Sequence, residues 1–403
     1  MQLDSEGFFH LTYCTNIHAA DGWAAVSDNL RQFAPELKRR LSPAAPFGLG
    51  LRLSARDARE LLEGDRLAEF RAFLDREGLY VALINGFPHG SFHRTAVKAA
   101  VYAPDWRDDE RVRYTLDLIE ILGGLLPSRL DGGISTAPLS YKPWMPTPTH
   151  AAWDRLVGNV VRVAEALVRV RQRTGAFIHL DIEPEPDCLI ETSNELIEFF
   201  ERRLVPDGGP RLAASLGCEA GQAADQLRDH VRMCLDCCHF AVEYEDPEAA
   251  LARVQHAGIQ VGRVQLSSAL KVTFPGPGQE SDAIAGRLRR FADSTYLHQV
   301  IERRGADLRH VPDLGEALDG PAPLPGTEWR IHFHVPLFTA EYDGLGSTQD
   351  YVSTVLGIAR QKRFARHFEI ETYTWDVLPD GLKVDLLDSI GREYEWVLKE
   401  WKK

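Results

Sequence analysis

Short apolar runs alternate with longer amphipathic segments along almost the whole chain, and few folds accommodate such an alternation. Segments such as 54–78, which begins at Ser54, and 153–175, which ends at Gly175, predict helices with a capping serine and a terminating glycine. Strands separated by helices predict a parallel sheet, and eight or nine repeats favour a closed (β/α)8 TIM barrel over an open sheet. The nine predicted strands are 8–16, 46–54, 78–87, 130–140, 176–184, 232–240, 261–270, 329–338 and 366–375.

Nine predicted strands are one too many for the eight places in such a barrel. Residues 271–328 contain most of the irregular sequence, including DGPAPLPGTE, and read as an insertion or long loop region after strand seven. We therefore expect a single TIM-barrel domain over 1–403, with the run 329–338 as the strand outside the barrel. No G-x-G-x-x-G follows the first predicted strand, which disfavours dinucleotide binding.

Ionisable residues interrupt several predicted strands near their carboxyl ends, which form the catalytic face of a TIM barrel. Glu183 ends one strand, with Glu185 as the alternative, and Asp236 and His239 flank the end of the next. Glu371 is the acidic residue nearest the end of the last strand. Charge inside a buried strand is costly without a partner, so these side chains favour a shared divalent-metal site. Salt-bridged strand ends and a capping aspartate remain the structural alternative.

Further polar residues interrupt the later strands. His332 and His334 form an H-x-H pair, a spacing that lets both imidazoles reach one ion or line one pocket. The amide oxygen of Gln265 could coordinate a hard cation or hold a substrate hydroxyl. Glu369 would lie deeper than Glu371 and would need a buried partner.

Two histidines occupy predicted loop ends, His89 in INGFPHG and His18 in TNIH. Each is more often structural than functional, and we favour His89 over His18 as part of the pocket lining.

The formal net charge is −13, from 46 Lys plus Arg and 59 Asp plus Glu, so nucleic acid is a poor expected partner. No apolar stretch has the length of a transmembrane segment, and the polar N-terminal residues lack a secretory signal pattern. Six scattered cysteines suit reduced thiols, and Cys234 and Cys237 have no second pair with which to form a zinc site. We expect a cytoplasmic protein. The terminal helix predicted at 392–403 packs on the barrel or on a second copy, which leaves a homo-oligomer open.

The order of these motifs resembles the xylose-isomerase-like superfamily of sugar isomerases, sugar epimerases and endonuclease IV relatives. CLDCCHF is similar to the LDTxH segment of that group, which supplies an Asp ligand and a nearby His. Over nearly the whole chain, LTYCTNIHAADGW, INGFPHGSFH, IEPEPDCLIET, CLDCCHFAVEYE and IHFHVPLF resemble the EboE-type metabolite traffic proteins. That family's label fixes no reaction, so the resemblance implies fold and site more than chemistry.

The resemblance implies that Glu183, Asp236 and Glu371 are metal ligands. Gln265 stands where the sugar epimerases have a histidine, and His332 or His334 could replace that imidazole. The implied enzyme is an isomerase or epimerase of a sugar-like or cyclitol-like carbonyl compound. A Mn²⁺, Mg²⁺ or Zn²⁺ ion would polarise the carbonyl while Glu183 and Glu371 exchange a proton at carbon. His239 would orient Asp236 or a substrate oxygen.

Two other classes remain open. A binding or traffic protein would use the same pocket for a small metabolite without turnover. A phosphodiesterase of the endonuclease IV type would need a fuller His/Asp/Glu set and a path for DNA, and both the charge of −13 and Gln265 argue against it.

Overall fold

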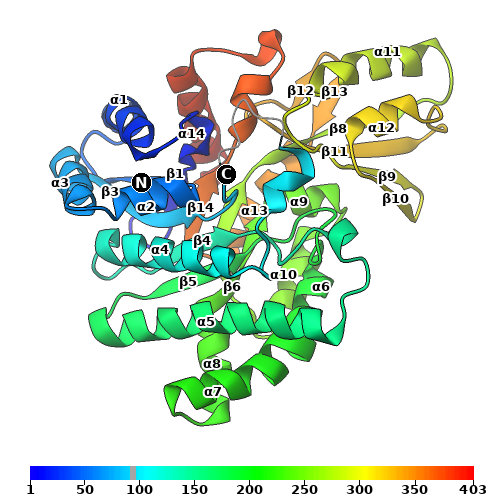
Figure 1. The fold of residues 1–403 in the computed structure, drawn as a ribbon. Coiled ribbons are helices and arrows are strands. Elements are labelled where there is room, and N and C mark those ends of the chain that lie inside the picture. Colours follow the sequence, from blue (N-terminus) through cyan, green and yellow to red (C-terminus); the bar gives the residue numbers. More distant parts are fainter. Residues whose placement is uncertain (91–96) are drawn as a thin grey trace.

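The computed structural model describes residues 1–90 and 97–403, and its central feature is a sheet of eight parallel strands (Figure 1). The strand order is β1-β14-β7-β6-β5-β4-β3-β2, with β1 parallel to β14. A parallel bridge between Cys14 and Gly50 closes β1 against β2, so the prediction of a (β/α)8 barrel is confirmed. The strands are β1 (His10–Tyr13), β2 (Phe47–Arg52), β3 (Leu79–Asn85), β4 (Gly132–Thr136), β5 (Ile178–Ile182), β6 (Val231–Asp236), β7 (Val261–Leu266) and β14 (His367–Ile370).

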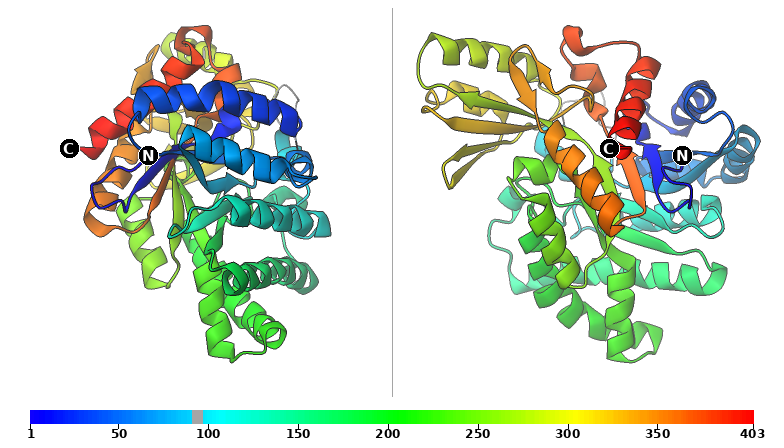
Figure 2. Two further views of the ribbon diagram at one scale, coloured as in Figure 1. Left: turned by 90° about the vertical axis from the view of Figure 1, so that its left-hand side faces the viewer. Right: turned by 180° about the vertical axis from the view of Figure 1, so that it is seen from behind.

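Helices follow the strands and cover the outside of the barrel (Figures 1 and 2). The α-helices are α1 (Trp23–Leu41), α2 (Ala55–Leu61), α3 (Arg66–Glu77), α4 (Asp109–Leu125), α5 (His150–Thr174), α6 (Ser193–Phe199), α7 (Gly209–Leu216), α8 (Ala220–His230), α9 (Cys237–Val242), α10 (Pro247–His256), α13 (Gln349–Lys362) and α14 (Leu386–Trp401). Short 3-10 turns are η1 (Thr15–Ile17), η2 (Lys98–Tyr102), η3 (Lys142–Trp144), η5 (Arg289–Phe291), η6 (Tyr373–Val377) and η7 (Asp380–Leu382), and η4 (Phe200–Gly208) is a π-helix.

The predicted helix caps are present, but one predicted helix is two. Ser54 accepts a hydrogen bond from the backbone of Asp57 in a reciprocal capping box, and Gly175 ends α5 with φ of 76°. The segment 54–78 breaks between α2 and α3, where Gly64 has φ of 61°, a left-handed conformation that a continuing helix does not allow.

A second, antiparallel sheet of six strands is inserted between β7 and α13, and it projects from one side of the barrel (Figure 2). This inserted sheet spans 268–347, with strand order β10-β9-β11-β8-β13-β12, so the excursion begins earlier and ends later than 271–328. Its elements are β8 (Ser268–Phe274), α11 (Gln279–Leu288), β9 (Val300–Arg304), β10 (Asp307–Val311), α12 (Leu314–Asp319), β11 (Thr327–Val335), β12 (Glu341–Tyr342) and β13 (Leu345–Ser347). The run 329–338 therefore lies outside the barrel sheet, mostly in β11.

The barrel interior contains a buried ion-pair network in addition to apolar side chains. Arg263 of β7 donates to Asp181 of β5 at 3.1 Å and to Glu369 of β14 at 3.1 Å. Glycines make room for these groups, since a Cβ at Gly50 would lie 1.5 Å from Glu369 Oε1 and one at Gly262 would lie 1.9 Å from Asp181 Oδ1. Arg263 is thus the buried partner that Glu369 requires.

Helix α14 packs on the barrel through its apolar face. The Trp401 ring contacts Phe9 edge-on, with 4.7 Å between centroids, and lies 5.8 Å from Phe368 of β14. Among the residues that the structure describes, no helix combines the length and apolar character needed to cross a membrane.

Candidate metal centre

Three carboxylates converge at the carboxyl ends of β5, β6 and β14. Glu183 follows β5, Asp236 ends β6, and Glu371 follows β14. One carboxylate oxygen from each lies within 4.8 Å of the others, and all three side chains are buried. The structure therefore brings together the three acidic residues that the strand ends indicated.

Asp236 both caps a helix and faces the centre. Its Oδ1 accepts from the backbone N–H of His239 at 3.0 Å, which starts α9, and from Ser267 Oγ at 2.7 Å. Its Oδ2 is buried and has no hydrogen-bond partner among the described residues. Asp236 therefore caps α9, and the same side chain lies beside the carboxylates of Glu183 and Glu371.

Three imidazoles surround the carboxylates with their Nε2 atoms directed inward. Nδ1 of His239 lies 3.0 Å from Pro184 O, that of His332 lies 2.8 Å from Gln299 Oε1, and that of His334 lies 2.9 Å from Glu371 O. A carbonyl oxygen next to each Nδ1 fixes a proton there, which leaves the Nε2 lone pair for a ligand.

The two Nε2 atoms of His239 and His332 are only 3.1 Å apart, although both carry lone pairs in this tautomer. Burial lowers the pKa of His332 well below its usual value and the pKa of His334 to about 4. The rings of His332 and His334 are therefore neutral at neutral pH. Neutral, inward-facing imidazoles of this kind are the form that binds metal ions.

The donors fall into overlapping groups that suit a divalent cation. Asp236, His239 and His334 form one group with atoms within 4.8 Å, and Glu185, His239 and His332 form another. Glu185 Oε2 and His334 Nε2, like Asp236 Oδ2, are buried without a hydrogen-bond partner in the described part of the chain. Unpartnered buried polar atoms are costly, and a cation held by Asp236, His239 and His334 would satisfy two of the three. The residues present therefore fit a metal ion.

The acidic residues differ in pKa because they share a buried space. Burial raises the pKa of Glu183 and of Glu371 well above the usual value, and the neighbouring carboxylates raise both further. Burial also raises the pKa of Glu185 to about 7, although Tyr102 donates to it at 2.8 Å. Burial acts upward on Asp236 too, but His239 and His334 outweigh it and lower its pKa.

Glu183, Glu185, Glu371 and the three histidines line a cavity of about 70 Å³, which gives room for several water molecules or a small ligand. Its opposite wall is largely apolar and aromatic. Tyr102 is stacked between Phe87 and Tyr141, at 5.7 and 5.1 Å between centroids. Lys98 also lines the cavity, with Nζ 2.5 Å from Asp313. The remaining described wall residues, apart from the acidic and histidine side chains named above, are Asn16, Pro88, Val97, Val101, Tyr296, Leu297 and Tyr373.

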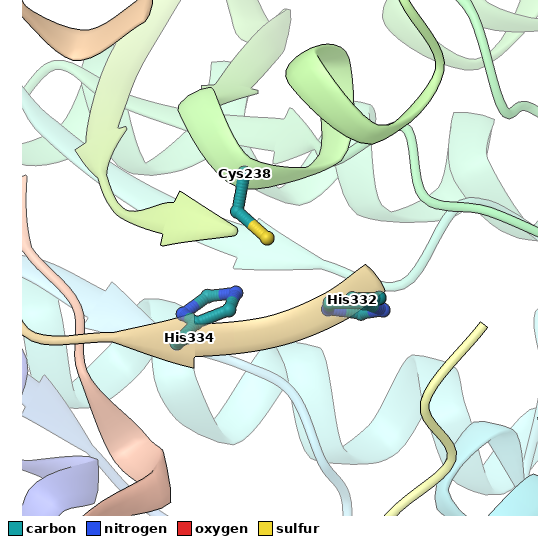
Figure 3. Close-up of side chains that lie close together, drawn as sticks. All are labelled: Cys238, His332 and His334. Atoms are coloured by element: carbon teal, nitrogen blue, oxygen red, sulfur yellow. The ribbon is translucent and has the colours of Figure 1, made fainter. Parts of the chain in front are cut away.

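Strand β11 of the inserted sheet supplies two of the three histidines (Figure 3). The pairing of β11 with β8 shifts register between Ile331 and His334, an irregularity that re-aims side chains, and both His332 and His334 line the cavity. Figure 3 shows the sulfur of Cys238, on α9, directed toward this strand. Its sulfur and the two rings lie within 4.8 Å, and burial raises the pKa of the thiol, which keeps it neutral. Cys238 was not among the residues that the sequence indicated.

Gln265 lies elsewhere. Its amide oxygen accepts from Cys234 Sγ at 2.8 Å and its nitrogen donates to Asn85 at 3.2 Å, inside the barrel. In the register of β14 and β7 it stands opposite Glu369, two residues below Glu371. The side chain after β7 that reaches the carboxylates is Ser267, through its bond to Asp236. The structure therefore does not bring Gln265 to the predicted ligand set.

The two loop histidines do not line the cavity. His89 Nε2 lies 3.8 Å from Glu110, and its ring contacts Tyr114 edge-on. His18 lies 3.1 Å from the Tyr13 hydroxyl and stacks on Phe33. The residue from this part of the chain that does reach the site is Asn16, which donates to Glu371 Oε1 at 2.9 Å.

No family model matches the chain, and no curated protein matches its sequence. Several solved structures are similar. A crystal structure of IolI protein with a binding zinc atom shares 12% identity at a TM-score of 0.47, covering 98% of this chain and 99% of that one. The probable 3-DHS dehydratase AsbF of Bacillus anthracis shares 12% identity at a TM-score of 0.46, covering 98% of this chain and 99% of that one. A D-tagatose 3-epimerase-like protein shares 10% identity at a TM-score of 0.47, covering 98% of this chain and 100% of that one. Membership of the EboE type stays a prediction.

Proposed function

We propose that this chain is a divalent-metal-dependent isomerase or epimerase of a small sugar-like or cyclitol-like carbonyl compound. The observation that supports this most directly is the pair Glu183 and Glu371, two buried carboxyl groups of raised pKa that face one cavity. Such an enzyme needs one group that accepts a proton from carbon and one that returns it, and perturbed carboxyl groups in a cavity suit both tasks.

Glu183, Asp236, Glu371 and His334 would hold the metal ion. The ion would supply Lewis-acid polarisation of the substrate carbonyl and of its neighbouring hydroxyl. Mixed oxygen and nitrogen donors leave Mn²⁺, Mg²⁺ and Zn²⁺ as candidates.

The two glutamates can act from different sides of a substrate because β5 and β14 are separated in the sheet by β6 and β7. In this proposal one carboxylate removes the proton beside the carbonyl, and the other, held protonated, delivers a proton to the neighbouring carbon or to the opposite face. Asn16 fixes Glu371 through Oε1. The apolar wall excludes water from the reacting groups.

The test is solvent proton exchange. The purified protein, loaded with Mn²⁺ or Zn²⁺, is incubated in D₂O with a panel of ketoses and keto-cyclitols, and deuterium at the carbon beside the carbonyl is followed by NMR. We expect incorporation with the wild type and a loss of at least ~100-fold in Glu183→Gln and Glu371→Gln. His89→Ala, which changes a loop histidine outside the cavity, is the matched control and should keep the wild-type rate.

Two outcomes would replace this proposal. Saturable binding of a panel compound without exchange would favour a metabolite-binding or traffic protein. Hydrolysis of bis-p-nitrophenyl phosphate without exchange would favour a metal-dependent phosphodiesterase. The group Glu185, His239 and His332 beside the three carboxylates gives that second enzyme class the fuller ligand set it needs. The small cavity and the charge of −13 suit a small phosphoester rather than DNA.

A further inference from the structure

Gln299, the residue directly before β9 of the inserted sheet, connects three segments that meet at the cavity. Its side chain is 1% exposed, and it is not among the described residues that line the cavity. It contacts Pro186 in the loop after β5, Tyr102 at the end of η2, and His332 of β11. Tyr102 and His332 do line the cavity, so Gln299 lies directly behind two of its walls.

The contacts of Gln299 fix the orientation of its amide group. Its Nε2 donates to the carbonyl oxygen of Pro186 at 3.1 Å and to the hydroxyl oxygen of Tyr102 at 3.2 Å. A reversed amide would place Oε1 against the Pro186 carbonyl oxygen, and two acceptors form no hydrogen bond. Oε1 therefore faces His332, whose Nδ1 lies 2.8 Å away and carries the proton of that hydrogen bond.

The consequence at His332 is an Nε2 atom that carries a lone pair and faces the cavity. This Nε2 lies 3.1 Å from Nε2 of His239, whose own Nδ1 donates to Pro184 O at 3.0 Å. Two lone pairs at this distance repel each other. A proton on Nε2 of His332 would instead be donated to His239, and the Gln299 amide oxygen opposes that arrangement by holding the proton on Nδ1. Glu185 Oε1 lies 4.0 Å from Nδ1, too far to replace the amide oxygen.

Gln299 also acts on Glu185, through Tyr102. The Tyr102 hydroxyl accepts from Gln299, so its single proton is directed to Glu185 Oε1 at 2.8 Å. The other oxygen of Glu185 is buried and has no hydrogen-bond partner in the described ranges. One side chain of the inserted sheet therefore sets the hydrogen-bonding state of two groups that face the cavity.

We propose that Gln299 is a positioning residue that keeps Nε2 of His332 open to a bound ligand by holding the imidazole proton on Nδ1. The ligand of such a lone pair is a divalent cation or a hydrogen-bond donor such as a substrate hydroxyl. Ligand atoms of Glu185 and His239 lie within 4.8 Å of that of His332, so the ligand would contact this group beside the three carboxylates. The tautomer of His332 does not depend on the proposed function, whereas its effect on proton exchange rests on it.

The first experiment determines the tautomer in the metal-free full chain, labelled with ¹⁵N in its histidine rings. NMR correlation of ring nitrogens with ring C–H protons distinguishes a protonated Nδ1 from a protonated Nε2, and His332→Asn assigns the signals of His332. We expect the Nδ1–H form in the wild type and the Nε2–H form in Gln299→Leu. A wild-type ring protonated on Nε2, or one tautomer in both proteins, would overturn the proposal.

Three further variants separate this effect from a general loss of packing. Gln299→Met keeps an unbranched side chain without an amide oxygen and should give the same result as Gln299→Leu. Val300→Ala truncates the buried residue next to Gln299, so it should lower the unfolding midpoint without changing the tautomer. Tyr102→Phe leaves the Pro186 carbonyl to orient the amide, so the Nδ1–H form should persist. A changed tautomer in Val300→Ala would show that packing, and not the Gln299 amide, determines it.

The second experiment repeats the deuterium-exchange assay with the metal content measured by plasma mass spectrometry. Gln299→Leu should exchange ~10–100-fold more slowly than the wild type, as expected for a residue that orients a ligand-binding histidine, and Val300→Ala should not. A lower metal content in Gln299→Leu identifies the ion as the ligand of His332, and a raised KM at full metal content identifies a substrate hydroxyl. An altered tautomer with unchanged exchange and metal content would overturn the role of Gln299 in the site. If the wild type itself shows no exchange, the proposed function fails, and the NMR result still decides the tautomer.

Discussion

Arg263 lies in the middle of β7 with no exposed side-chain surface, and it neutralises two carboxylates that the barrel interior could not otherwise contain. Replacing it by methionine keeps much of its volume but leaves Asp181 and Glu369 buried without their counter-charge. We expect Arg263→Met to lower the free energy of unfolding by ~3–5 kcal/mol, measured by urea denaturation.

The matched control is Arg39→Met, because Arg39 forms an exposed pair with Glu36 on α1. It should leave the urea midpoint unchanged, since exposed pairs contribute little. A wild-type midpoint in Arg263→Met would mean that the two interior carboxyl groups are accommodated without this arginine.

The acidic residues of the site could be predicted because each stands where an apolar strand ends, and parallel strands end at one face. Ser267 and Asn16 could not, since their contacts with Asp236 and Glu371 join distant segments through side chains common in any loop. Arg263 was missed because its partners lie on two other strands. His18 and His89 turn away from the cavity because loop backbone does not fix a direction as a strand does.

At the scale of elements, α14 carries an acidic side chain into its packing surface. Thr372 donates to Glu393 Oε1 at 2.6 Å and Leu337 N–H at 3.1 Å, yet burial dominates and raises the pKa of Glu393 to about 7, from an ordinary 4.5. The folded chain therefore holds this proton between about pH 4.5 and 7 while the unfolded chain releases it. The stability that the protonated Glu393 gives the folded chain is fully present below pH 4.5 and is lost as the pH rises through 7.

Glu393→Gln keeps an oxygen acceptor for Thr372 and cannot ionise. We expect the variant to gain stability relative to wild type as the pH rises from 5 to 8, by at most ~3 kcal/mol, measured by urea denaturation at each pH. Other titrating groups cancel in this difference. A difference independent of pH would show that Glu393 titrates alike in the folded and unfolded chains.

The barrel strands were predictable because each is a short apolar run bounded by polar or glycine-rich sequence. The limits of the inserted sheet were not. Strand β8 follows β7 after one residue, Ser267, so the predicted strand 261–270 contains parts of both. A change from parallel to antiparallel pairing leaves no mark in the periodicity of the sequence, and only the partner strands define it.

At the scale of the whole molecule, a metal ion at the proposed centre would link the barrel to the inserted sheet, because Glu183, Asp236 and Glu371 belong to the barrel and His334 to the inserted sheet. A ligand that binds only the folded chain stabilises it by ~2.7 kcal/mol at 100 times its dissociation constant. We expect Mn²⁺ or Zn²⁺ to raise the thermal midpoint of chelator-treated protein by a few degrees, measured by calorimetry. In Asp236→Asn most of this gain should disappear, and an equal gain in that variant would place the binding elsewhere.

The closing strand of the barrel is also the last to be synthesised. Residues 267–366 separate β7 from β14, so seven strands leave the ribosome with the unpaired edges of β7 and β1 exposed. At ~5–20 residues per second, this gap lasts roughly 5–20 s, during which the inserted sheet is made and can fold beside the open edge. The nascent chain is therefore most exposed to strand-edge aggregation in that interval. We expect a lower growth temperature or additional chaperone to raise the yield of folded protein by acting in this interval, without changing the stability of the finished protein.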